Sequence, residues 1–138
     1  MSSFFLAWKR AMDFEGRSSR KEYWMFQLAN ILLMLVLLFF ALGITIIAAV
    51  VSHGTDTPLT ERALLASQIL FAVFICASFV PSYACLVRRL HDTGKSAAWT
   101  ILLAVPVLGF AVYVFAMFDS FPGSNRYGSS PKALTTEY

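Results

Sequence analysis

Three long stretches without a charged residue dominate this chain, at positions 23–51, 63–87 and 96–118. An α-helix rises about 1.5 Å per residue and the hydrocarbon layer of a bilayer is about 30 Å thick, so roughly 20 apolar residues suffice to cross it. Each stretch exceeds that length. Hydrophobic residues make up 58 % of the chain and charged residues 14 %, against about 45–50 % and 25 % in soluble domains. The sequence therefore predicts a polytopic membrane protein.

Local signals set the ends of the predicted helices. Ser19 and Glu22 form a capping box, in which the two side chains satisfy backbone N–H groups at the start of a helix. Pro58 suits a first helical turn, Gly94 is placed to cap the end of a helix, and Ser96 can cap the next one. The predicted spanning helices therefore cover 20–51, 58–91 and 96–118.

The segments outside these helices are short. Phe4, Trp8 and Met12 recur at four-residue spacing, with Lys9 and Asp13 on the opposite side, a pattern typical of a helix that lies flat at the membrane surface. Proline and glycine residues make the last segment irregular. The predicted fold class is therefore an all-α membrane protein forming a single domain. It has three transmembrane helices, preceded by a short amphipathic interfacial helix within 1–18 and followed by an irregular tail at 119–138.

The distribution of lysine and arginine predicts a cytoplasmic N-terminus, because cytoplasmic flanks hold more of both. Five basic residues lie between Lys9 and Lys21, whereas the first loop has only Arg62. Three complete spans would place the tail outside the cell. In an alternative topology, Pro106 and Gly109 turn the third stretch back at mid-depth as a re-entrant pair of short helices. The full span is favoured, because a re-entrant turn must hide its non-helical backbone from lipid.

Three polar motifs flank the apolar stretches: an N-terminal motif at 14–24 (FEGRSSRKEYW), a central motif at 87–96 (VRRLHDTGKS) and a C-terminal motif at 123–128 (GSNRYG). With these motifs the chain closely resembles domain-of-unknown-function family 805, a family of small bacterial inner-membrane proteins. The resemblance covers almost the whole chain. It departs at 97–99, where a small residue followed by two tryptophans is usual, and at 129–130, where a proline and a polar residue are usual. It implies a multi-helix protein of the bacterial plasma membrane and no activity, since the family is itself uncharacterised.

The motifs also predict a binding surface. The first two motifs bring their cations to one membrane face beside aromatic residues, where arginine offers a planar fork to phosphate and each cation gains about 1 kcal/mol from anionic lipid. A simpler reading is that these cations only set the orientation of the helices. The candidate residues for binding lipid or a protein partner are Arg17, Arg20, Lys21, Trp24, Arg88, Arg89, His91, Asp92, Lys95, Asn125 and Arg126.

His91 beside Asp92 suggests a catalytic base with a carboxylate to orient it. Adjacent helical residues point about 100° apart, however, so the two side chains do not face each other. We expect Asp92 to cap the turn or to pair with Arg88 or Arg89 instead. No catalytic residue, metal ligand or cofactor is predicted.

The predicted function is therefore that of a non-enzymatic integral membrane protein that engages anionic lipid or a protein partner through a basic and aromatic cluster on the cytoplasmic face. The alternative is a small transporter or channel subunit. Ionisable residues within spans mark ion pathways, and the three apolar stretches contain no lysine, arginine, aspartate or glutamate. The expected partners are membrane lipids, with a second copy of the chain or another membrane protein as further candidates. Nucleic acid is not expected, because the basic residues lie at the ends of apolar helices.

Overall fold

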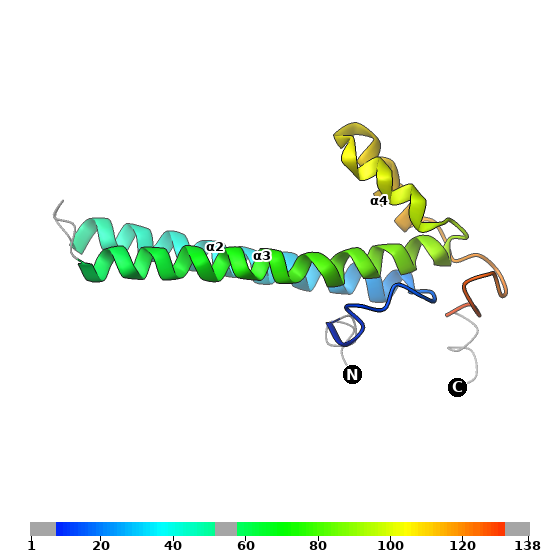
Figure 1. Cartoon of the computed structure of the whole chain (residues 1–138), viewed down its shortest axis with the longest axis horizontal. Helices are drawn as coiled ribbons and strands as arrows, with labels where there is room; N and C mark the ends of the chain where they lie inside the picture. Colours follow the sequence, from blue (N-terminus) through cyan, green and yellow to red (C-terminus); the bar gives the residue numbers. More distant parts are fainter. Residues whose placement is uncertain (1–7, 52–57, 132–138) are drawn as a thin grey trace. The chain divides into compact units, whose positions relative to one another are not determined.

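The computed structural model describes residues 8–51 and 58–131, and these residues are built mainly from helices (Figure 1). Two long α-helices, α2 (Arg20–Val51) and α3 (Pro58–Asp92), are followed by a 3₁₀ helix, η1 (Ala97–Ala104), and a short α-helix, α4 (Pro106–Met117). In the described part of the chain, the only extended pairing is an isolated bridge between Asn125 and Gly128. The predicted all-α class is confirmed.

The predicted starts of the first two helices agree with the structure. Helix α2 begins at Arg20, directly after Ser19, whose Oγ accepts a hydrogen bond of 3.2 Å from the backbone N–H of Glu22. This is one half of the predicted capping box. Helix α3 begins at Pro58, where the missing proline N–H leaves no donor unpaired.

The end of α3 also agrees with the sequence. Gly94 has a φ of +80°, a conformation that glycine adopts without steric cost. Its N–H donates to the carbonyl of His91 over 3.0 Å, and the N–H of Lys95 donates to the carbonyl of Leu90 over 2.9 Å. These two bonds form a Schellman motif, which satisfies carbonyls that the helix leaves unpaired. The helix consequently stops within the central motif.

Helices α2 and α3 have the length and composition to cross a membrane. In their most apolar windows, only 6 % of the residues of α2 and 11 % of those of α3 are buried within the structure. The core helix of a soluble protein would be mostly buried, so these helices need lipid or protein around them.

The continuous helix expected over 96–118 is not present. It is replaced by η1 and α4, with a break at Val105, whose φ of −113° and ψ of 112° are extended. Pro106 causes the break, because its ring excludes the preceding residue from the helical conformation and it has no N–H to donate. Ser96 stands at the start of η1 without a side-chain capping bond. The 12 residues of α4 cover only about 18 Å, and three transmembrane helices are not confirmed.

Elements η1 and α4 form a helical hairpin around a glycine contact. A Cβ atom placed on Gly109 would lie 3.6 Å from the Cα of Leu103 and 3.7 Å from the carbonyl oxygen of Leu102. Gly109 is buried. A Cβ at this position would be at an ordinary van der Waals distance, so the two arms pack against each other at Gly109.

The predicted interfacial helix falls partly outside the described residues, which begin at Trp8. In the remaining part, the N–H of Ala11 donates to the carbonyl of Trp8 over 3.2 Å, and the N–H of Asp13 donates to the carbonyl of Arg10 over 3.1 Å. These are turn-like bonds, and a glycine with positive φ, Gly16, follows them. The interfacial helix stays a prediction.

The chain divides into two compact units. The first, called the motif unit, comprises 1–27 and 80–138 and contains all three motifs. A hydrophobic cluster at its centre combines residues from the first turns of α2, the last turns of α3 and the second half of α4. These are Tyr23, Phe26, Cys85, Leu86, Leu90, Val112 and Ala116.

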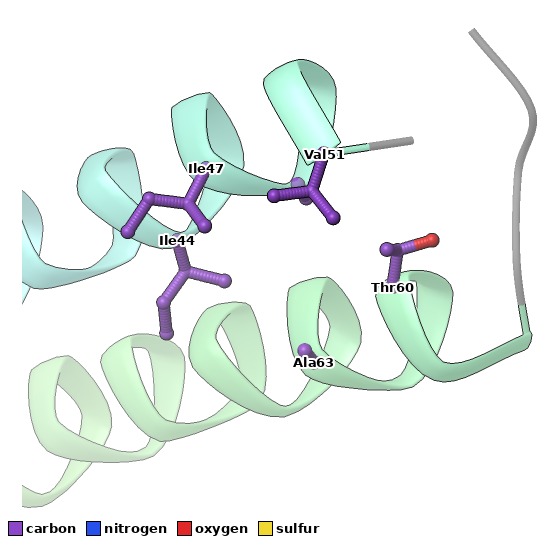
Figure 2. A pocket seen from close by; sticks show the side chains of 6 residues that line it. Ile44, Ile47, Val51, Thr60 and Ala63 are labelled. Atoms are coloured by element: carbon purple, nitrogen blue, oxygen red, sulfur yellow. The ribbon is translucent and has the colours of Figure 1, made fainter. Parts of the chain in front are cut away.

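The second unit, called the helical unit, comprises 28–79. It contains an apolar pocket of about 190 Å³ between the end of α2 and the start of α3 (Figure 2). The walls carry aliphatic side chains and one threonine: Ile44, Ile47, Ala48, Val51, Thr60 and Ala63. Among the described residues, no charged group lines this pocket, so its surface suits a hydrocarbon environment.

The hairpin gives a first prediction, at Gly109. Gly109→Ala should fold normally, because the added Cβ meets Leu103 at an ordinary contact distance. Gly109→Leu should push the two arms apart and lower the free energy of unfolding by about 1–3 kcal/mol, the usual cost of overpacking. Thermal unfolding in detergent would compare the two variants with the parent. Equal midpoints for the leucine variant and the parent would contradict the close packing.

Candidate functional site

Asp92, the last residue of α3, lies at the centre of a fully buried polar cluster. Its Oδ1 accepts a hydrogen bond of 2.9 Å from Arg17 Nε, and its Oδ2 accepts one from Arg89 Nη1 and one of 2.6 Å from Ser120 Oγ. The side chains of both arginines and the aspartate are shielded from solvent. We call Arg17, Arg89 and Asp92 the arginine–aspartate cluster.

Arg17 joins the N-terminal motif to the C-terminal tail. Its Nη1 donates to the carbonyls of Gly123 over 2.8 Å and Gly128 over 3.2 Å. Its Nη2 donates to the carbonyls of Phe121 over 2.8 Å and Asp92 over 3.3 Å. All donors of this guanidinium are thereby directed at protein oxygens, as a buried arginine requires.

Arg89 joins the end of α3 to the end of the hairpin. Its Nε donates to the carbonyl of Ala116 over 3.0 Å, and its Nη2 donates to the carbonyl of Phe118. Its Nη1 also reaches the carbonyl of Ser18 at 3.3 Å. The carbonyls of Ala116 and Phe118 lie at the end of α4, where a helix leaves carbonyls unpaired and its dipole is negative. A guanidinium is well placed there.

Arg88 holds the N-terminal segment. Its Nη1 donates to the carbonyl of Arg10 over 2.7 Å and to that of Asp13 over 2.5 Å, and its own carbonyl accepts a bond of 3.2 Å from the N–H of Ser18. Arg88 is fully buried. Burial tends to raise the pKa of Asp13, but hydrogen bonds from the Arg10 side chain and the N–H of Glu15, together with the charges of Arg10 and Arg88, outweigh it, so the pKa is lowered. Asp13 thus stays charged beside two arginines.

The C-terminal motif packs onto His91. The side-chain amide of Asn125 donates to the carbonyl of His91 over 2.9 Å, and the side-chain oxygen of Asn125 accepts a bond of 2.9 Å from the N–H of Tyr127. The rings of His91 and Tyr127 are stacked, with centroids 3.7 Å apart and planes 5° apart. The guanidinium of Arg126 lies 4.7 Å from the centre of the tyrosine ring, a favourable cation–π distance.

The structure therefore gathers all three motifs in the motif unit. The expected pairing of Asp92 with Arg89 is found, whereas the pairing with Arg17 was not foreseen. The tail was expected on the opposite side of the membrane from the first two motifs. Instead, it contacts both of them through Arg17 and His91. The difference follows from the hairpin, because a chain that turns back at Val105 returns to the level from which it started.

The arrangement offers no catalytic pair at His91 and Asp92. The histidine ring stacks on Tyr127, while the carboxylate of Asp92 accepts hydrogen bonds from two arginines and a serine. In the pair suggested by the sequence, Asp92 would orient the imidazole as a general base, and here the aspartate is engaged elsewhere. Within 8–51 and 58–131, no three side chains of His, Cys, Asp or Glu are grouped in a way that could hold a metal ion.

The candidate binding residues separate into two groups. Arg17, Arg88, Arg89, His91 and Asp92 are buried, and Asn125 is partly covered. Arg20, Lys21, Trp24 and Arg126 are exposed, although Arg20 forms an ion pair of 3.1 Å with the exposed Asp119. Lys95 is half-buried, with its Nζ 4.3 Å from the ring centre of Phe115 and 5.6 Å from that of Trp99. A headgroup arriving from outside would meet the exposed group first.

Several partners in the cluster were missed by sequence reasoning. Ser120, whose hydroxyl donates to Asp92, lies in a segment that looks irregular, and most of the acceptors are backbone carbonyls, such as those of Ala116, Phe118 and Phe121. A backbone carbonyl leaves no mark on the sequence, because every residue has one. The one available signal was that the motifs contain more arginines than acidic residues, so some arginines had to donate hydrogen bonds to other acceptors.

The cluster predicts a large difference between two conservative substitutions. Asp92→Asn removes the charge that two buried arginines share, so we expect the free energy of unfolding to fall by about 3–5 kcal/mol. Asp119→Asn breaks an exposed pair and should cost less than about 1 kcal/mol. Thermal unfolding of the purified variants in detergent measures both. Similar losses for the two variants would contradict the central role of Asp92.

His91 gives a further prediction, which separates packing from chemistry. His91→Ala should lower the amount of folded protein, because it removes a ring stack worth about 0.5–1.5 kcal/mol. His91→Phe keeps a ring and should restore part of that loss. Protein abundance and a cellular phenotype would be measured for both variants. Loss of the phenotype in both, at unchanged abundance, would instead indicate a chemical role for the imidazole.

Comparison with known proteins gives a consistent assignment. The chain is similar to two proteins of Escherichia coli K12: it is 37 % identical to inner membrane protein YhaI over 125 residues, covering 90 % of each chain. It is 36 % identical to inner membrane protein YhaH over 125 residues, covering 90 % of this chain and 91 % of the relative. No solved structure matches the chain. The family described as "Protein of unknown function (DUF805)" matches residues 11–129, and the chain therefore belongs to this family of membrane proteins.

Proposed function

We propose that this protein is a non-enzymatic, multi-pass protein of the bacterial plasma membrane, with a cytoplasmic N-terminus, whose motif unit engages anionic lipid headgroups. One observation carries the proposal. Buried hydrogen bonds hold the three motifs together, while a separate set of cations remains on the surface of the same unit. The buried hydrogen bonds hold the motif unit together, and the exposed cations lie on its surface, where a ligand can reach them.

The surface cations have the composition of a headgroup site. Arg20 and Lys21 stand in the first turn of α2, and the exposed ring of Trp24 follows one turn later. Tryptophan settles at the level of the headgroups, and cations near the surface of an anionic membrane each gain about 1 kcal/mol. These residues therefore combine a depth anchor with a charge that favours anionic lipid.

The opposite ends of α2 and α3 differ in this respect. Arg62, near the start of α3, is exposed next to the acidic Glu61. Residues 52–62 contain one basic and two acidic residues, whereas residues 1–24 contain five basic and three acidic residues. This asymmetry supports both the cytoplasmic placement of the N-terminus and a lipid site restricted to one face.

The experiment compares two sets of cations by native mass spectrometry with lipids retained. In the double variant Arg20→Gln/Lys21→Gln, we expect the retention of phosphatidylglycerol relative to phosphatidylethanolamine to fall by roughly fivefold per charge removed. Arg62→Gln, which removes a cation at the other end, serves as the control and should leave the ratio unchanged. Both changes concern exposed side chains, so folding should be preserved.

Neutralising Arg88 and Arg89 would not serve this purpose, because both are buried and their loss would disturb folding rather than a surface. Equal phosphatidylglycerol retention by the double variant and the parent would refute the lipid site. In that case a protein partner would be the next candidate for the same surface.

A further inference from the structure

We infer that the hairpin formed by η1 and α4 enters one leaflet of the membrane and leaves on the side where it entered, so that the N-terminal and C-terminal motifs lie on the same side of the membrane. The inference is independent of the lipid site proposed above. It places the apolar surface of the hairpin in contact with the acyl chains of that leaflet.

The entry and exit of the hairpin are fixed at one level. The entry follows directly from the end of α3, where Lys95 is bonded to Leu90. At the exit, the carbonyl of Phe118 accepts a hydrogen bond from Arg89, and the N–H of Phe121 donates to the carbonyl of Asp92 over 2.8 Å. Arg89 and Asp92 belong to the last turn of α3. A segment that crossed the membrane would separate its two ends by about 30 Å, which these bonds exclude.

The dimensions of the hairpin match one leaflet. The eight residues of η1 extend about 16 Å at the rise of a 3₁₀ helix, and the 12 residues of α4 extend about 18 Å at the rise of an α-helix. Half of the hydrocarbon layer is about 15 Å thick. Each arm is therefore long enough to reach the middle of the bilayer and too short to cross it.

The outer surface of the hairpin is apolar and uncovered. Ile101, Val107 and Phe110 are exposed to 75 %, 77 % and 73 %, and no charged residue occurs from 96 to 118. Apolar side chains exposed to this extent around the turn need a hydrophobic surrounding. At the base, the exposed ring of Trp99 lies beside the ammonium group of Lys95, which is the composition of a membrane interface.

Part of the backbone of the turn is paired. The N–H of Val105 donates to the carbonyl of Leu102 over 3.1 Å, and the carbonyl of Val105 accepts a bond of 2.8 Å from the N–H of Gly109. Irregular turns are excluded from lipid because they leave backbone groups unpaired. Since Pro106 has no N–H, this turn has one such group fewer.

Cysteine labelling of the full-length protein in intact cells tests the inference. Single cysteines replace three exposed residues, Lys9, Arg62 and Ser124, and are treated with a membrane-impermeant maleimide before and after permeabilisation of the inner membrane. The parent gives the background, because its two cysteines, Cys76 and Cys85, lie within α3. We expect Lys9→Cys and Ser124→Cys to react only after permeabilisation, and Arg62→Cys to react before it.

The relation between positions decides the outcome. Reaction of Ser124→Cys on the side of Lys9→Cys supports the one-leaflet hairpin whichever side that is, whereas reaction on the side of Arg62→Cys overturns it. A further variant, Val107→Cys, tests insertion. We expect it to stay unlabelled in permeabilised membranes and to react once the membranes are dissolved in detergent. Labelling of Val107→Cys as readily as Ser124→Cys would place the hairpin outside the bilayer and refute its insertion.

Discussion

The sharing of one buried carboxylate by two buried arginines is the interaction on which the motif unit depends. Removing a charged group from water costs several kcal/mol unless its partners are well placed. Asp92 supplies one negative charge to Arg17 and Arg89, so the excess positive charge must be compensated by other oxygens. These come from backbone carbonyls in the N-terminal motif, at the end of α4 and in the tail. Each segment is held because it supplies acceptors that the arginines need.

Helix ends make this arrangement favourable. The last turn of a helix leaves carbonyls without partners and concentrates negative potential. Both α3 and α4 end beside the cluster, so a guanidinium there satisfies carbonyls that would otherwise require water. In a membrane environment this polar contribution is important, since lipid tails are as apolar as leucine and provide no hydrophobic drive for helices to associate. The contact of the two hairpin arms at Gly109 adds packing within the same unit.

The cations of the three motifs therefore have different roles that their residue type does not reveal. Arg17, Arg88 and Arg89 are structural, whereas Arg20, Lys21 and Arg126 remain on the surface. A binding surface that included all the motif cations would be too large, because a ligand cannot reach the buried Arg17, Arg88 and Arg89. The arginines that hold the fold are those with several acceptors inside it, because a guanidinium offers five donors in a rigid fork and can join several segments at once.

The sequence by itself determined the class of the protein and the ends of its long helices, because these depend on local signals. Uncharged stretches longer than a bilayer, Ser19 before α2, Pro58 at the start of α3 and Gly94 after its end all act within a few residues. The third stretch was misjudged as one helix even though Pro106 was noted, because a re-entrant turn has to hide its non-helical backbone from lipid. Only the tertiary structure decided that the chain turns back at Val105 and that the tail meets the other motifs. The physical reason is that Arg17 and Arg89 donate to backbone carbonyls about 30 to 110 residues away. Every residue has a backbone carbonyl, so the residue type does not show which one an arginine will bind.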